Sequence, residues 1–404
     1  MTATDATEGR LREFIASRHG AMLDDLRHAV DTPTGPGSGS GLDDLRRWFR
    51  ERLERLGATC ELVPGEPREP WTAGEAAPGP VPPTLVARRV LAGPSLLLGG
   101  HLDTVHRADS PFRALAVSPD GRTITGPGCV DMKGGLVVAL HALEALEHCG
   151  IRLSWTFLLN SDEETGSFHS AATLAREAAR GHLAGLVFEP AMADGGLAIS
   201  RPGSGQFMIE TFGKAGHVGR DFASCVSAVT AIAKTLVAVG AWSDPARGLI
   251  ASVGPLQGGQ ATNIVPDHAA AWGNFRVVDN HAAAEIASRL DALATDPSAM
   301  PRVAVRRCFN RPAKPLTPAT ERLALAAREA AASLGQSLPF GATGGVCDGN
   351  NLQAAGLPTI DTLGVRGGGL HTTSEWVEAA SLVERAQLVA VLMARLGRGG
   401  VALA

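Results

Sequence analysis

The strongest constraint on the fold is a short apolar run that recurs along the chain and ends each time in polar or ionisable residues. The run Ser95–Leu98 leads to His101, and the run Trp155–Leu159 leads to Glu163. Helix-like stretches such as Met132–His148 separate the runs. Buried strands that alternate with helices are typical of a mostly parallel sheet covered by helices. The pattern therefore predicts an α/β domain.

The chain between residues 203 and 312 follows a different pattern. Three stretches there read as strands and two read as helices: Gln206–Phe212, Leu249–Val253 and Ala269–Val277, then Val218–Val239 and Ala282–Leu293. These elements predict an inserted α+β domain with an antiparallel sheet. With crossings at Pro202–Gly203 and Asn310–Pro312, the α/β domain comprises residues 1–202 and 313–404, and the inserted domain comprises residues 203–312.

Composition excludes several classes of protein. The 404 residues are 45% hydrophobic and 19% charged with a net charge of −4, so we expect a globular protein without a nucleic-acid or membrane partner. No apolar stretch is long enough to span a bilayer, and Met1–Glu8 lacks the basic and apolar regions of a secretory signal. The six cysteines form no C-x-x-C pair, which favours a reduced, cytoplasmic protein.

Two histidines and three carboxylates lie at the ends of predicted strands or in the loops that follow them. Open α/β sheets bind ligands at this edge, and these side chains are suited to divalent cations. The candidates are His101, Asp131, Glu164, Glu189 and His371. A two-metal site needs ions about 3.5–4 Å apart and a carboxylate that bridges them. Taken singly, Asp131 is also explained as a helix cap, and Glu164 as part of a solvated acidic turn.

Two further carboxylates accompany these candidates. His101 and Asp103 are two residues apart, so on a strand they point to the same side and Asp103 can support the imidazole. Alternatively, Asp103 caps a helix. Glu163 and Glu164 are neighbours, and their side chains therefore point in different directions on an extended segment. One can bind metal while the other faces a water molecule.

In this order, the motifs resemble those of the M20 metallopeptidases, a family that includes glutamate carboxypeptidase, acetylornithine deacetylase, succinyl-diaminopimelate desuccinylase and the aminoacylases. The resemblance extends from about residue 95 to 380. It rests on GHLDTV (100–105), GPGCVDMKGG (126–135), SDEETGS (161–167), FEP (188–190), GKAGH (213–217), GGQATNIVPD (258–267), GGVCDGNN (344–351) and HTTSE (371–375). The motifs HLDTV and DGNN are most similar to the glutamate-carboxypeptidase branch.

The resemblance implies two zinc ions bridged by Asp131, with Co²⁺ or Mn²⁺ as alternatives because oxygen and nitrogen ligands serve all three. His101 and Glu189 would complete the ligands of one ion, and Glu164 and His371 those of the other. The peptide bond between Asp131 and Met132 would be cis.

Catalytic roles follow from the same resemblance. Asp103 would orient His101, and Glu163 would be the general base on the bridging water. His217 would hold the oxyanion in the active site of a partner subunit, which implies a homodimer that forms through the inserted domain and closes on the substrate.

Two residues of the inserted domain would bind the substrate. Asn263 would contact its polar groups, and Arg276 would bind its free carboxylate through the guanidinium fork. Without the resemblance, Arg276 reads as a charge on an exposed strand and His217 as a residue of a surface turn.

The expected function is therefore metal-dependent hydrolysis of an amide bond in an N-acyl amino acid or a peptide-like substrate with a free carboxylate, with glutamate as a candidate product. Two alternatives stay open: a non-catalytic protein for binding or assembly, and a two-metal hydrolase acting on a phosphoester. The chain departs from the family at Arg201–Gly203, Ser227–Val229 and Cys347. These departures leave the substrate open. Cys129 and Cys347 are expected near the site, but not as ligands.

Overall fold

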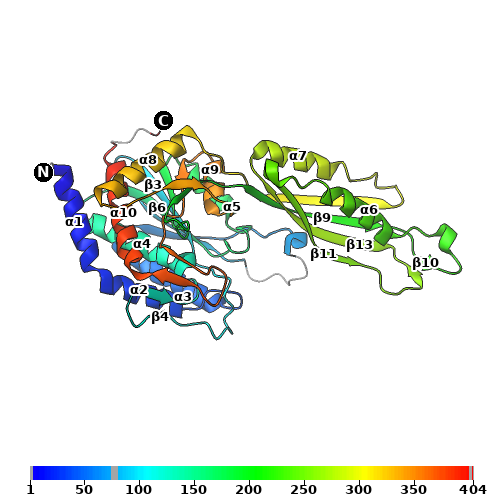
Figure 1. Cartoon of the computed structure of the whole chain (residues 1–404), viewed down its shortest axis with the longest axis horizontal. Coiled ribbons are helices and arrows are strands. Elements are labelled where there is room, and N and C mark those ends of the chain that lie inside the picture. The colour runs from blue at the N-terminus through cyan, green and yellow to red at the C-terminus, as the bar shows by residue number, and fades with distance from the viewer. Residues whose placement is uncertain (1–2, 74–80, 400–402, 404) are drawn as a thin grey trace.

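A six-stranded sheet forms the centre of the larger domain in the computed structural model, which describes residues 3–73, 81–399 and 403 (Figure 1). The strand order is β1-β2-β6-β3-β7-β16. The bounds are β1 (Thr59–Val63), β2 (Thr84–Arg89), β3 (Ser95–His101), β6 (Ser154–Asn160), β7 (Ala184–Val187) and β16 (Thr359–Ile360). The four strands from β6 to β16 pair in parallel, and β1 and β2 form an antiparallel edge. The expectation of a mainly parallel sheet is confirmed.

Helices cover both faces of this sheet. The larger hydrophobic core lies beneath α1 (Ala3–Ser17), α2 (His19–Asp31), α3 (Gly39–Arg55), α4 (Gly134–His148), α8 (Pro318–Ser333) and α10 (Ala379–Gly397). A smaller core lies beneath α5 (Ala171–Ala178) and α9 (Asp348–Ala354). On β3, Leu96 and Leu98 enter the larger core, whereas Leu97 enters the smaller one. Burial on both faces explains why these strands read as continuous apolar runs.

Short strands complete the larger domain. A four-stranded sheet has the order β17-β18-β5-β4, and β8 pairs in parallel with β15. The bounds are β4 (Ala116–Val117), β5 (Thr123–Thr125), β17 (Gly367–Gly368), β18 (Trp376–Glu378), β8 (Leu197–Ser200) and β15 (Phe340–Ala342). A single turn of irregular helix, η2 (Cys129–Lys133), precedes α4. No helix among the described residues is both long and apolar enough to cross a membrane.

The inserted domain is built on an antiparallel sheet of order β11-β13-β9-β14 (Figure 1). The bounds are β9 (Gly203–Phe212), β11 (Leu249–Gly258), β13 (His268–Val277) and β14 (Arg302–Arg311). Helices α6 (Ala228–Gly240) and α7 (Asn280–Asp291) share one core with one face of the sheet. On the opposite face, Trp71 from η1 (Pro70–Ala73) packs against the sheet and accepts a hydrogen bond from Trp272 through its carbonyl oxygen (3.0 Å).

The predicted helix Val218–Val239 is wrong over its first half. The segment follows β10 (Gly216–His217) and contains the 3-10 turn η3 (Phe222–Ser224), and α6 begins only at Ala228. Ser227 ends the irregular segment because its side chain accepts a hydrogen bond from the N–H of Thr230 (3.1 Å), as a helix cap does. The strand β14 and the helices α8 and α10 were not predicted.

The two crossings between the domains lie side by side. Arg201 and Lys314 exchange backbone hydrogen bonds of 2.9 and 3.0 Å. The Asn350 side-chain amide donates to the carbonyl oxygens of both Pro202 (2.9 Å) and Pro312 (2.8 Å). All four strands of the antiparallel sheet fall within residues 203–311. The exact domain boundaries stay a prediction.

Candidate metal and acid–base site

Five predicted ligands come from five separate segments at the carboxyl edge of the six-stranded sheet. His101 ends β3, Glu164 follows β6, and Glu189 follows β7. Asp131 lies in η2, and His371 lies in the loop between β17 and β18. The structure brings all five side chains together.

Asp131 stands between the two histidines. Its Oδ1 is 3.3 Å from His101 Nε2, and its Oδ2 is 3.5 Å from His371 Nε2. Glu189 Oε2 lies 3.9 Å from the same nitrogen of His101. On the other side, Glu164 Oε2 lies 3.2 Å from His371 Nε2. The cluster therefore has two halves that share one carboxylate.

Several ligand atoms of the cluster are buried without a hydrogen-bond partner among the described residues. They are His101 Nε2, Asp131 Oδ1 and Glu189 Oε1. The His101 Nδ1–H donates to the carbonyl oxygen of Asp103 (2.9 Å), which leaves Nε2 to face the carboxylates. Buried, unpaired polar atoms are costly, and a divalent cation would satisfy them. The donor set thus fits a metal.

Proton affinities in the cluster are displaced by burial and by mutual charge. Burial and then the charge of Asp131 raise the pKa of Glu164 to about 8. The contact with Asp131 raises the pKa of His371 to about 9. Burial opposes ionisation of Asp131, but its contacts with His101 and His371 outweigh burial and lower the pKa of this carboxyl. Without a cation, protons balance the crowded charges, and metal binding would release them.

Asp103 does more than the sequence predicted. Its Oδ1 is 3.5 Å from His101 Nδ1, which agrees with an orienting role. Its carboxylate also accepts the backbone N–H groups of Glu163 (3.3 Å) and Glu164 (3.0 Å). Asp103 therefore fixes the acidic turn relative to β3.

Glu163 lies beside this cluster with its side chain 12% exposed. Burial raises the pKa of Glu163 to about 7, although the positive charge of Arg311 acts in the opposite direction. Arg311 Nη2 donates to Glu163 Oε1 at 2.6 Å, and Nη1 donates to Asp348 Oδ1 at 2.8 Å. Arg311 was missed because the segment Asn310–Pro312 was interpreted only as a crossing between domains.

Glu375 was also missed, although it ends the HTTSE motif. Its buried carboxylate accepts the backbone N–H groups of Gly128 (2.8 Å), Val130 (2.9 Å) and Asp131 (3.0 Å). His106 Nε2 lies 2.7 Å from the same carboxylate. Glu375 thus joins the loop that carries His371 to the loop that carries Asp131. The Asp131–Met132 peptide bond is cis, as the resemblance implied.

The structure does not bring the three predicted residues of the inserted domain into the cluster of five candidate ligands. His217 and Asn263 are exposed at the short antiparallel ribbon formed by β10 and β12 (Ile264–Val265), which lies at the far end of the molecule from the larger domain (Figure 1). Arg276 is half-buried on β13, and burial together with the nearby charge of Arg311 lowers its pKa. Its buried Nη1 has no hydrogen-bond partner among the described residues.

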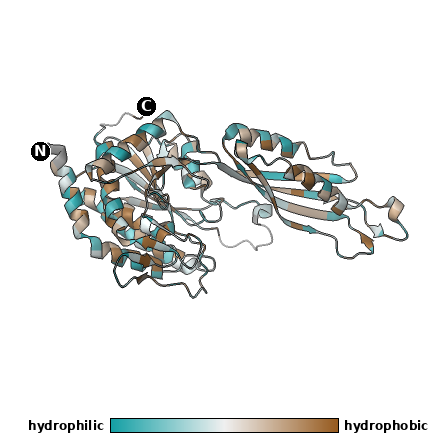
Figure 2. Ribbon diagram, in the orientation of Figure 1, coloured by the Kyte–Doolittle hydropathy of each residue, from teal (hydrophilic) through white to brown (hydrophobic). Residues whose placement is uncertain are grey.

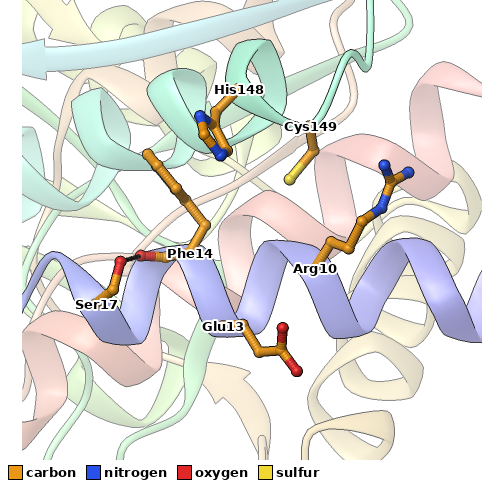
Figure 3. A pocket seen from close by; sticks show the side chains of 6 residues that line it. All are labelled: Arg10, Glu13, Phe14, Ser17, His148 and Cys149. Atoms are coloured by element: carbon orange, nitrogen blue, oxygen red, sulfur yellow. Dashed lines mark hydrogen bonds between the residues drawn. The ribbon is translucent and has the colours of Figure 1, made fainter.

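The two cysteines expected near the site are both buried. Cys347 caps α9 by accepting the N–H of Gly349 at 3.3 Å, and Cys129 lies in η2 beside Asp131. Burial raises the pKa of both thiols. A separate pocket of about 390 Å³ lies between α1 and the end of α4, lined by Phe14, His148 and Cys149 among others (Figure 3). None of the predicted site residues lines it.

Comparisons with known proteins show which family and which relatives this chain is similar to. The model of peptidase family M20/M25/M40 matches residues 97–395. The chain is 29% identical to carboxypeptidase G2 of Pseudomonas sp. (strain RS-16), over 94% of this chain and 90% of the relative. It is 31% identical to succinyl-diaminopimelate desuccinylase 2 of Shewanella loihica, over 74% and 84%. A tripeptidase from Staphylococcus aureus has a similar structure, with a TM-score of 0.74, 23% identity, and 94% and 99% of the two chains covered.

Proposed function

The chain belongs to peptidase family M20/M25/M40, a family of metal-dependent hydrolases, and on that premise we propose that it is a two-metal amidohydrolase. It would cut an amide bond in an N-acyl amino acid or a peptide-like substrate with a free carboxylate. The single observation that carries this proposal is the placement of Asp131, whose two oxygens face different histidines.

The metal ligands follow from the two halves of the cluster. His101, Asp131 and Glu189 would hold one cation, and Asp131, Glu164 and His371 the other. Nitrogen and oxygen donors of this kind suit zinc, with cobalt and manganese as alternatives. When bound, a cation pair supplies a water of lowered pKa and polarises the amide carbonyl.

Glu163 is suited to proton transfer. A carboxyl group with a pKa of about 7 exchanges protons readily near neutral pH. Its Oε1 is held by Arg311, and Oε2 receives no hydrogen bond from the described residues. Glu163 would take a proton from the attacking water at a carboxylate oxygen and later pass it to the leaving nitrogen.

Substrate binding would involve the inserted domain. Nη1 of Arg276 is buried and has no hydrogen-bond partner in the described part of the chain, so it is suited to bind a substrate carboxylate. We propose that His217 and Asn263 act in a partner subunit, because both are exposed at the far ribbon of β10 and β12 in their own chain.

An apolar surface on the inserted domain supports a homodimer. Helix α6 is largely hydrophobic (Figure 2), yet its Val237 is 76% exposed. On β11, which is an edge strand, Leu256 is 59% exposed. Exposed apolar side chains next to an unpaired strand edge are typical of association surfaces. The cytoplasmic location stays a prediction.

A hydrolysis screen tests the proposed function. N-acyl amino acids and dipeptides are incubated with the protein, with and without zinc, and released amino acids are measured. We expect turnover that chelation abolishes. Glu163→Gln should keep its metal and lose about 10²–10⁴-fold in kcat. Turnover by Glu163→Gln at the parent rate would refute the assigned base.

The alternatives give other results. A non-catalytic protein would show no turnover and well under one metal per chain after zinc supplementation. A phosphoesterase would cleave a generic phosphoester and none of the amides. The similarity to a carboxypeptidase and to a desuccinylase favours the amide.

A further inference from the structure

The side chain of Arg311 is buried, with only 1% of it exposed. Arg311 is the last residue of β14, and Pro312 begins the return to the larger domain. A buried guanidinium is costly unless carboxylates compensate its charge. Glu163 and Asp348 supply that compensation, one at each terminal nitrogen, at 2.6 and 2.8 Å.

The larger domain fixes the orientation of Asp348, the second carboxylate that Arg311 contacts. Asp348 accepts a hydrogen bond from Ser167 Oγ (2.6 Å) through Oδ1 and one from Asn160 Nδ2 (2.7 Å) through Oδ2. These two hydrogen bonds fix the orientation of the Asp348 carboxylate, which in turn holds Nη1 of Arg311. Because a guanidinium is planar and its donors diverge at fixed angles, pinning one nitrogen also fixes the direction of the other. That other nitrogen contacts Glu163.

Arg311 differs in this respect from Arg276. Both terminal nitrogens of Arg311 are already engaged by protein carboxylates, and its Nε is the nitrogen left unpaired, whereas Arg276 has a buried terminal nitrogen, Nη1, without a partner among the described residues. A substrate carboxylate would meet an available terminal donor at Arg276 but would have to displace Glu163 or Asp348 from the terminal nitrogens of Arg311. The hydrogen bonds therefore favour a role for Arg311 toward Glu163 and not toward the substrate.

The end of β14 also contacts the acidic turn at a second point. Asn310 Nδ2 donates to the carbonyl oxygen of Gly166 at 3.1 Å. Two consecutive residues of the inserted domain thus hold the turn that carries Glu163. A shift of β14 relative to the larger domain would move both contacts.

We propose that Arg311 is a positioning residue that holds Oε1 of Glu163 and leaves Oε2 directed at the reacting water. The orientation of the base then depends on where the inserted domain stands. This inference rests on the proposed function, since it takes Glu163 as the base.

The test compares Arg311→Lys and Arg311→Ala with the parent enzyme on a substrate from the hydrolysis screen. Lysine keeps the charge but loses the fork, so we expect kcat to fall about 10–100-fold while KM changes less than about threefold. Metal content should stay at the parent value. Millimolar guanidinium should restore part of kcat in Arg311→Ala and have no such effect on the parent.

Arg307→Lys is the matched control. Arg307 lies on the same strand but pairs with Asp291 at the surface, and the variant should keep the parent kcat. If the Arg311 variants fold poorly, Asp348→Asn serves as a second variant that keeps the side-chain shape. It should lower kcat at constant KM, because Arg311 loses the partner that pins it.

Three outcomes overturn the proposal: a rise in KM at constant kcat, which would make Arg311 a substrate-binding residue; loss of metal from Arg311→Lys; or parent kinetics in both Arg311→Lys and Asp348→Asn. Failure of the proposed function is distinguishable, because the parent would then show no amide hydrolysis or Glu163→Gln would stay active.

Discussion

The carboxyl edge of the six-stranded sheet and the far β10–β12 ribbon of the inserted domain carry the predicted site residues in opposite ways. At the sheet edge, five side chains from five segments meet within one chain. At the β10–β12 ribbon, His217 and Asn263 are exposed. One region is assembled by folding alone, whereas we propose that the other acts only after two chains associate.

The bridging carboxylate gives the largest expected effect. Asp131→Asn removes the charge shared by both halves of the cluster, so both cations should be lost together. We expect an activity loss of about 10³-fold or more, because bound metal supplies several kcal/mol of transition-state stabilisation. Metal analysis by mass spectrometry checks the stoichiometry. Retention of one tightly bound ion would break the picture of a single shared cluster.

Mixed dimers test whether His217 acts in the active site of the partner subunit. His217→Ala alone should lose about 10²–10³-fold in kcat, the usual effect of removing an oxyanion donor. If His217 acts in the partner, dimers of one His217→Ala chain and one Glu163→Gln chain contain one intact site. Co-purified heterodimers carrying two different tags should therefore regain about half of the parent kcat. Inactive heterodimers would place His217 in its own chain's site.

Glu375 tests how strongly the sheet-edge cluster depends on its supports. Glu375→Gln leaves one acceptor oxygen where the carboxylate serves three backbone N–H groups and His106. Loss of a residue that supports metal ligands typically weakens metal binding by about 10–100-fold. Competition with a chromophoric chelator measures the affinity. Glu378→Gln is the control, because Glu378 pairs with Arg366 at the surface.

The smallest effect concerns pH and the metal-free protein. The pKa of Glu164 is about 8 in the folded chain, above its ordinary value, so the folded state binds more protons than the unfolded one between about pH 4.5 and 8. His371, with a pKa of about 9, acts in the same direction. Stability should fall as pH rises from 5 to about 7, by about a few degrees in Tm, because above that pH the burial that lowers the pKa of Lys133 to about 7 acts in the opposite direction. Zinc should abolish the slope; a flat metal-free profile would contradict the pKa shifts.

The parts of the molecule that could be predicted are those with a local sequence signal. Apolar runs indicate the strands of the central sheet. His101 and Asp131 stand out because candidate metal ligands are limited to a few residue types, such as histidine and the carboxylates. Arg311 has no such signal, since its partners Glu163 and Asp348 are 148 and 37 residues away. Glu375 acts on backbone N–H groups, which every sequence contains. The start of α6 was misplaced because Val218 and Phe222 are apolar but exposed.

The side-chain amide of Asn350 binds the carbonyl oxygens of Pro202 and Pro312, so the chain leaves the larger domain and returns to it at one place. Segments of the inserted domain away from this place can be lengthened or reshaped during evolution without changing the distance between Pro202 and Pro312. Parts of the inserted sheet can thus change which molecules are bound, whereas Arg311 has to stay in place, because it ends β14 of the insertion and contacts Glu163.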